Sequence, residues 1–272
     1  MFKKCENTPT FFRVGDQPMP LERRKQILDL IYKKGVIKTV ELAKHFDVNI
    51  ATIRRDLKIL AREHPGIQIS YGGASLRKGQ TYQREQPMTE KLTQNVEQKM
   101  QIAQKAARLI EDGDIIALNC GSTVSLILDY LDPGIRKLTV ITLGFNIAEK
   151  AVRLPFVELI MPGGTYRHSS QVFWGRNAEM FLEDLVIDKA FFGAVAVDRV
   201  YGWTHSVLSE VEMNRIMFKN SRKRYLVADS SKYDKVSLGK VSDLCDFDAW
   251  IVDDGLPGQY VEYAEAHGIQ II

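Results

Sequence analysis

The feature that most constrains the fold of this chain is the stretch from Val48 to Leu60, which reads V-N-I-A-T-I-R-R-D-L-K-I-L. Apolar side chains recur along it with the spacing of one helical face, at Ile50, Ile53, Leu57 and Leu60. Asn49 stands just before this pattern, where an asparagine oxygen can accept a hydrogen bond from an N–H group of the first helical turn. We therefore predict a helix that starts after Asn49.

The opposite face of this helix is small and hydroxylic at its start and basic along its length. Its residues are Ala51, Thr52, Arg55, Lys58 and Arg62. A face of this kind is either simply solvated or bound to a polyanion. Arg54 lies at the flank, next to Asp56, so it either reaches the polyanion or forms an ion pair within the domain.

A second short helix is expected just ahead, where residues 39–46 read T-V-E-L-A-K-H-F with Thr39 as the expected N-cap. Only three residues separate the two helices, which is typical of a helix-turn-helix, whose second helix lies in the major groove of DNA. A further helix is expected over residues 21–33. Residues 67–71 alternate like a strand and end at Gly72-Gly73. Together these elements predict a winged helix over residues 21–74.

The distribution of charge agrees with DNA binding by the front of the chain. The net charge is +3 over 272 residues, but residues 1–80 hold 16 Lys and Arg against 8 Asp and Glu, a net of +8. The remaining residues hold 21 against 26, a net of −5. A basic front and an acidic rear indicate that only the front contacts a polyanion.

Two segments on either side of the winged helix carry no clear periodicity. Residues 1–20 contain several prolines and are predicted to form a flexible arm. Residues 75–95 are polar and are predicted to be a linker, whose basic side chains either touch DNA phosphates or are solvated.

From residue 96 onward, helical and strand-like patterns alternate. Helices are expected over residues 96–110, 120–131, 145–153 and a stretch ending at His267. Strands are expected over residues 115–118, 138–142, 157–161, 189–197, 224–228, 249–252 and 269–272. This alternation predicts an α/β domain over residues 96–272, with a mostly parallel sheet and helices on both faces. Ligands of such sheets bind in loops at the carboxyl ends of the strands.

Three of these loops carry side chains that suit an anionic ligand. Gly121-Ser122-Thr123 offers backbone N–H groups and two hydroxyls, which either hold a phosphate or cap a helix. Gly163-Gly164 either allows close backbone approach to a ligand or makes a turn. The run from Asp229 to Lys232 either binds a phosphorylated sugar or forms a capped turn with a surface ion pair.

Other kinds of site find no support in the sequence. Cys5, Cys120 and Cys245 are far apart, fit no metal spacing and are expected to be reduced thiols of a cytoplasmic protein. We predict no cofactor and no catalytic residue. No apolar run is long enough to span a membrane, and the first residues lack the apolar core of a signal peptide.

The motifs resemble those of a known family. Residues 23–60 and Tyr71-Gly72-Gly73-Ala74 resemble the DNA-binding domain of the DeoR family of bacterial transcriptional regulators, with Thr52-Ile53-Arg54-Arg55-Asp56-Leu57 matching its recognition helix. The resemblance assigns Thr52 and Arg55 to DNA. The full predicted set of DNA-binding residues is Thr39, Asn49, Ala51, Thr52, Arg54, Arg55, Lys58, Arg62 and Tyr71.

Residues 96–272 resemble the effector domain of the same family, which is similar to ribose-5-phosphate isomerase. The resemblance implies a homo-oligomeric repressor of carbohydrate genes, a dimer or tetramer, whose effector is a phosphorylated sugar or related metabolite. The predicted effector-binding residues are Gly121, Ser122, Thr123, Thr142, Gly163, Gly164, Arg167, His205, Glu210, Asp229 and Lys232. After Thr142 the family commonly has Asn, whereas this chain has Leu143.

A second class of function competes with this one. A sugar-phosphate isomerase or transferase with an accessory DNA-binding domain would need a general base, for which Asp198, Glu210 and Lys232 are candidates. A winged helix has no role in isomerisation, so we favour the regulator.

His205 is within reach of the predicted site, either as a ligand contact or as a structural residue. Trp174 and Trp203 either stack on a sugar or pack in the core.

Overall fold

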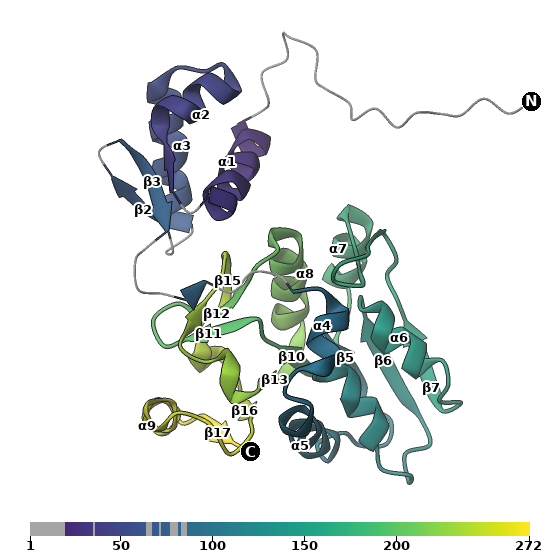
Figure 1. Ribbon diagram of the computed structural model, residues 1–272. Coiled ribbons are helices and arrows are strands. Elements are labelled where there is room, and N and C mark those ends of the chain that lie inside the picture. Colours follow the sequence, from purple (N-terminus) through teal and green to yellow (C-terminus); the bar gives the residue numbers. More distant parts are fainter. Residues whose placement is uncertain (1–19, 35, 64–66, 71, 77–80, 83–85) are drawn as a thin grey trace, which may run out of the picture. The chain divides into compact units, whose positions relative to one another are not determined.

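The computed structural model describes residues 20–34, 36–63, 67–70, 72–76, 81–82 and 86–272. The chain divides into two compact units, Met1–Lys78 and Gly79–Ile272 (Figure 1). The predicted arm over residues 1–20 lies outside the described residues, except for Pro20.

The first unit is a winged helix, as predicted. Its elements are α1 (Pro20–Lys34), β1 (Val36–Lys38), α2 (Thr39–Phe46), α3 (Ile50–Glu63), β2 (Ile67–Ser70) and β3 (Gly73–Leu76). The strands form an antiparallel sheet in the order β1-β3-β2. Apolar side chains from the three helices make the core, among them Ile27, Ile31, Leu42, Ile53, Leu57 and Leu60, each at most 2% exposed.

The turn between α2 and α3 explains why the second helix begins at Ile50. Asp47 ends α2 in the left-handed region, at φ 51°, and the Asn49 Oδ1 accepts a hydrogen bond of 2.9 Å from the Ala51 N–H. Asn49 is therefore the N-cap of α3, as predicted. The expectation for α2 was wrong by one residue: Lys38 is its N-cap, because Thr39 is already helical and its N–H donates to the Gly72 carbonyl.

A buried ion pair joins α1 to α3. The Arg23 Nε lies 2.7 Å from the Asp56 Oδ2, and both side chains are less than 10% exposed. A buried carboxylate without such a partner would be strongly destabilising, so this contact fixes how α3 packs on α1. It also decides one open question from the sequence, because the partner of Asp56 is Arg23 and not Arg54.

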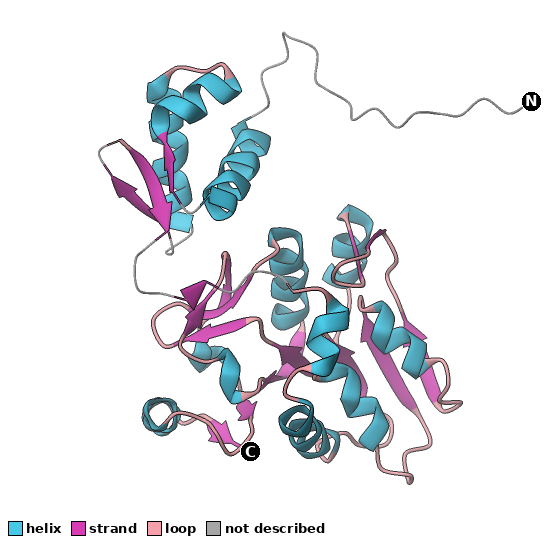
Figure 2. Ribbon diagram, viewed as in Figure 1, coloured by secondary structure: helices cyan, strands magenta, loops and turns pink. Residues whose placement is uncertain are grey.

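The second unit contains helices between strands, as Figure 2 shows. Its helices, including short 3₁₀ segments labelled η, are α4 (Met88–Thr93), α5 (Val96–Ala107), η1 (Val124–Tyr130), α6 (Phe145–Ala151), α7 (Arg176–Glu183), α8 (Leu208–Lys219), η2 (Ser230–Lys232), η3 (Leu244–Asp246) and α9 (Gly258–His267).

Its main sheet has seven parallel strands in the order β17-β16-β13-β10-β5-β6-β7. They are β5 (Ile115–Leu118), β6 (Leu138–Thr142), β7 (Val157–Ile160), β10 (Ile187–Gly193), β13 (Ser221–Val227), β16 (Ala249–Ile251) and β17 (Gln270–Ile271). Smaller sheets are formed by β4 (Thr81–Tyr82), β8 (Thr165–Arg167), β9 (Val172–Trp174), β11 (Ala196–Asp198), β12 (Gly202–His205), β14 (Lys235–Val236) and β15 (Gly239–Ser242).

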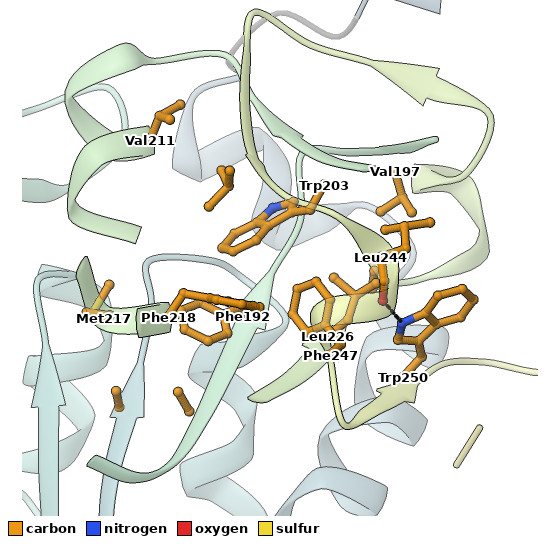
Figure 3. Close-up of a cluster of buried hydrophobic side chains, with 14 of the residues drawn as sticks. Phe192, Val197, Trp203, Val211, Met217, Phe218, Leu226, Leu244, Phe247 and Trp250 are labelled. Carbon is orange, nitrogen blue, oxygen red and sulfur yellow. Dashed lines mark hydrogen bonds between the residues drawn. The ribbon is translucent and has the colours of Figure 1, made fainter. Parts of the chain in front are cut away.

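Side chains alternate between the two faces of the main sheet, and each face has its own core. Phe191 of β10 packs with α5, η1 and α6, whereas Phe192 packs on the other side with α7, α8 and α9. Figure 3 shows the second core, where Phe192, Trp203, Phe218 and Phe247 lie ring against ring. Trp203 is fully buried there, so it packs in the core.

Three expectations for this unit need correction. The strand predicted over residues 189–197 is two strands, β10 and β11, separated at Ala194-Val195. The helix predicted to open at residues 120–123 is the short 3₁₀ segment η1, in which the Leu126 N–H bonds the Thr123 carbonyl three residues back. The predicted linker is partly regular: β3 extends into it, β4 pairs with β14, and α4 lies within it with Met88 buried.

Two adjacent glycines allow a test of the wing. A Cβ on Gly73 would lie 2.1 Å from the Ile37 carbonyl oxygen, whereas a Cβ on Gly72 would meet nothing within 4 Å. We expect Gly73→Ala to destabilise the winged helix by about 1–3 kcal/mol, because the β1–β3 pair must move apart. Chemical denaturation followed by circular dichroism measures this. Gly72→Ala is the matched control, and equal losses for the two variants would contradict the close approach.

Candidate functional site

The basic face predicted for α3 is exposed. Arg54, Arg55, Lys58 and Arg62 are all exposed along the helix, and so is Ala51 at its start, while Thr52 is half-buried. Ile53 and Leu57 occupy the opposite face in the core. The exposed face of α3 therefore carries small side chains at its N-terminal end and positive charges beyond it. This arrangement suits the edge of a base pair flanked by phosphates.

The remaining predicted DNA residues differ in accessibility. Asn49 is exposed, but its Oδ1 is engaged in capping α3. Thr39 is only 5% exposed, so most of its side chain lies inside the winged helix. Tyr71 lies outside the described residues.

The second unit has a pocket at the point where the strand order reverses. From β5 the chain continues outward through β6 and β7 on one side, whereas β10, β13 and β16 follow on the other. In a parallel sheet this arrangement leaves a crevice between the carboxyl ends of the two central strands. Asn119 joins these ends: its Nδ2 donates to the Gly193 carbonyl at 3.1 Å, and its Oδ1 accepts from the Gly193 N–H at 2.8 Å. These bonds end β10 and open the loop at Ala194-Val195.

Six predicted effector residues line this one pocket: Gly121, Ser122, Thr123, His205, Glu210 and Lys232. The space inside the pocket and its open mouth together is about 620 Å³, open solvent included. Ser122 and Thr123 are 6% and 7% exposed. Neither hydroxyl has a hydrogen-bond partner among the described residues, so both can turn toward a ligand.

The carboxylate of Glu210 organises the wall of the pocket. It is 1% exposed and accepts hydrogen bonds of 2.9 Å at Oε1 from the Arg167 Nη1 and the Ser170 Oγ. At Oε2 it accepts from the Cys120 thiol at 3.2 Å, and the His205 Nε2 lies 3.5 Å away. Because these partners satisfy its charge, Glu210 is a positioning group held in place by the surrounding elements.

The tautomer of His205 follows from its neighbours. Its Nδ1 accepts a hydrogen bond of 3.2 Å from the Val207 N–H, so a neutral ring carries its proton on Nε2. That nitrogen faces Glu210. His205 is 4% exposed, and these contacts give it a structural place at the edge of the pocket.

Five predicted effector residues do not line the pocket, and each has another role in the structure. Thr142 is fully buried, and its Oγ1 accepts from the Gly144 N–H. Gly163 and Gly164 adopt positive φ, and a Cβ on Gly164 would lie 2.6 Å from the Trp174 carbonyl oxygen. Arg167 holds Glu210 and stacks over Trp174, 5.1 Å from the ring centroid. Asp229 caps η2 by accepting from the Ser231 N–H.

Sequence reasoning missed several lining residues, namely Gln86, Met88, Lys91, Cys120, Ser170 and the loop from Gly193 to Val195. The buried lysine Lys99 was also not predicted. It is 3% exposed and donates to the Lys91 carbonyl. Burial lowers the pKa of Lys99 to about 8, Asp229 opposes this shift, and Lys232 and Lys91 add to it. Leu143 is 2% exposed and packs in the core, away from the pocket.

Two further observations concern the chemistry that the chain can support. In the part of the chain that the structure describes, no group of three or more His, Cys, Asp or Glu side chains could hold a metal ion. None of the described helices combines the length and apolar character needed to cross a membrane.

Comparison with known proteins relates both units to one family. Residues 23–80 match the DeoR-like helix-turn-helix domain, and residues 94–254 match the DeoR C terminal sensor domain. The chain is 35% identical over 238 residues to the lactose phosphotransferase system repressor of Staphylococcus aureus strain N315, covering 85% of this chain and 91% of the relative.

Two other relatives match over a similar share of this chain and of their own length. The L-fucose operon activator of Haemophilus influenzae is 32% identical over 92% of this chain and 98% of its own. The HTH-type transcriptional regulator IolR of Bacillus subtilis is 30% identical over 93% of this chain and 99% of its own.

Among solved structures, ribose 5-phosphate isomerase A from Methanocaldococcus jannaschii matches with a TM-score of 0.39 and 22% identity, covering 51% of this chain and 55% of that one.

The family matches exclude the alternative of an isomerase with an accessory domain, and they imply that the chain binds DNA through its first unit and an effector through its second. The chain therefore belongs to the DeoR family of transcriptional regulators.

Proposed function

We propose that this regulator represses genes of carbohydrate metabolism and that a phosphorylated sugar or related metabolite controls its binding to operator DNA. The observation that carries the proposal is the pocket at the strand switch, whose lining residues include Ser122, Thr123 and Lys232. Hydroxyl donors with a nearby cation suit a phosphate. The names of the relatives place them in sugar operons, as a lactose phosphotransferase system repressor and an L-fucose operon activator.

The proposed DNA contacts follow from the exposed face of α3. Arg55 reaches a base edge, with Thr52 beside it at the start of the helix, and Lys58 and Arg62 contact phosphates. In this proposal Arg54 is available to DNA because Asp56 is paired with Arg23. Thr39 is left out of the proposed DNA contacts, because it is 5% exposed and its N–H donates to the Gly72 carbonyl.

Control by the effector is a population shift. The sensor units assemble into dimers or tetramers that place winged helices on paired half-sites. A ligand that binds the DNA-incompetent arrangement more tightly lowers operator affinity, by no more than its differential affinity for the two arrangements.

Removing the central arginine of α3 tests the DNA contacts. We expect Arg55→Ala to weaken operator binding by about 5–150-fold, because a bidentate arginine–guanine contact is worth about 1–3 kcal/mol. Fluorescence anisotropy with an operator fragment measures the affinity at fixed salt. Lys25→Ala removes the same charge from α1 and should cost less. The assignment of Arg55 fails if the two variants lose the same affinity or if Arg55→Ala binds as tightly as the parent chain.

Removing the cation of the pocket tests the effector site. A phosphorylated sugar that binds only the native state raises the melting temperature of the full chain, and the matched unphosphorylated sugar does not. We expect Lys232→Gln to weaken binding of this ligand by about 10–150-fold, because a hydrogen bond to a charged group is worth about 1.5–3 kcal/mol.

The exposed Lys219→Gln serves as the control for this experiment and should keep the full shift. An undiminished shift in Lys232→Gln would remove Lys232 from the site. Equal stabilisation by the free sugar would show that the phosphate is not what the pocket recognises.

A further inference from the structure

One wall of the pocket is made by the first part of the second unit, the segment that follows the winged-helix unit in sequence. The winged-helix unit ends at Lys78, and the sensor helix α5 begins at Val96. Gln86, Met88 and Lys91, which lie between these points, all line the pocket. Residues that follow the DNA-binding unit closely in sequence therefore line the ligand space.

Among the described residues of this segment, Met88 and β4 contact other parts of the sensor unit. Met88, at the start of α4, is 2% exposed, and its N–H donates to the Ser169 carbonyl at 2.9 Å. Before it, β4 pairs in parallel with β14, so that Thr81 is opposite Lys235, close in sequence to Lys232. Most of the other residues of α4, including Leu92 at 44% exposure, face solvent. A six-residue helix with one deeply buried side chain gains little stability of its own.

The second half is tied to the turn that carries Lys232. The Asn95 side chain donates from Nδ2 to the Asp229 Oδ1 and to the Ser231 Oγ, each at 3.0 Å. The buried Lys99 donates from Nζ to the carbonyl of Lys91. The position of α4 and the position of η2 (Ser230–Lys232) therefore depend on shared contacts.

The lysines on and near α4 and η2 favour binding of an anion between these two elements. Lys91 from α4 and Lys232 from η2 both line the pocket, and Lys99 lies buried under the end of α4. Burial is the main cause of the lowered pKa of Lys99, Asp229 opposes it, and Lys232 and Lys91 add to it, so these charged groups act on one another. An anion that contacts both pocket lysines is attracted to each of them, and this shared attraction links α4 to η2.

We propose that Lys91 is an effector-binding residue and that α4 is the element through which occupancy of the pocket reaches the connection to the winged helix. An anionic group bound between Lys91 and Lys232 holds α4 on the sensor unit and adds to the contacts that Met88, Asn95 and Lys99 make there. This inference rests on the proposed function, because it requires an anionic effector in this pocket.

Amide hydrogen exchange of the full chain tests the inference, with inorganic phosphate as the probe against chloride at equal ionic strength. At phosphate ten times above its dissociation constant, any opening that releases the anion becomes about tenfold rarer. We expect the amides of residues 90–93 and of residues 121–125 to exchange about tenfold more slowly with phosphate. In Lys91→Gln, phosphate should bind more weakly and, at concentrations adjusted to its new dissociation constant, should still protect residues 121–125 but no longer residues 90–93. Lys219→Gln should behave as the parent chain.

The possible failures are distinct. Protection of residues 121–125 alone in the parent chain would overturn the role of α4 and leave the phosphate site intact. A Lys91→Gln chain that binds phosphate as tightly as the parent and keeps both protections would overturn the role of Lys91. Protection of neither segment in the parent chain would overturn the phosphate site of the proposed function and the inference that rests on it.

Discussion

The sensor unit depends most on one buried carboxylate, that of Glu210. Leaving a charge in the interior is costly unless it is paired and fully hydrogen-bonded, so the elements that supply its partners are constrained to meet at one point. Arg167 comes from β8, His205 from β12, and Cys120 from the loop after β5, while Glu210 itself stands on α8. Their meeting point is one wall of the pocket. The same contacts that satisfy the charge therefore give the site its shape.

In the winged helix, too, a buried ionic contact fixes how the elements pack. The buried pair between Arg23 and Asp56 fixes α3 against α1, and the apolar residues of α3 complete the core. The basic residues of α3 are then left on the outside, in a row set by the helical repeat. In both units a buried ionic contact determines the packing, and the residues proposed to recognise DNA or the effector lie on the surface that this packing leaves accessible.

Sequence patterns predicted the parts of this structure that depend on local order. The helical repeat of Ile53, Leu57 and Leu60 and the cap at Asn49 predicted α3, and loops after apolar strands predicted the place of Ser122 and Lys232. What escaped prediction depends on distant contacts. The end of β10 is set by the side chain of Asn119, 74 residues earlier in the chain. The helix α4 is too short for periodicity to be detected, and the strands β8 and β9 have three residues each. The pocket residues on α4 and at Gly193–Val195 were missed for these reasons.

The central claim is that one molecule bound at the strand switch changes how the winged helix binds DNA. The most direct measurement is the operator dissociation constant of the full chain, taken with and without a saturating phosphorylated sugar that stabilises the protein. We expect the ligand to raise this constant by about 5–150-fold, the usual size of an allosteric coupling, and the matched free sugar to leave it unchanged. An operator affinity that is the same with and without the bound ligand would contradict the account, because it would show that the pocket and the DNA-binding surface are not coupled.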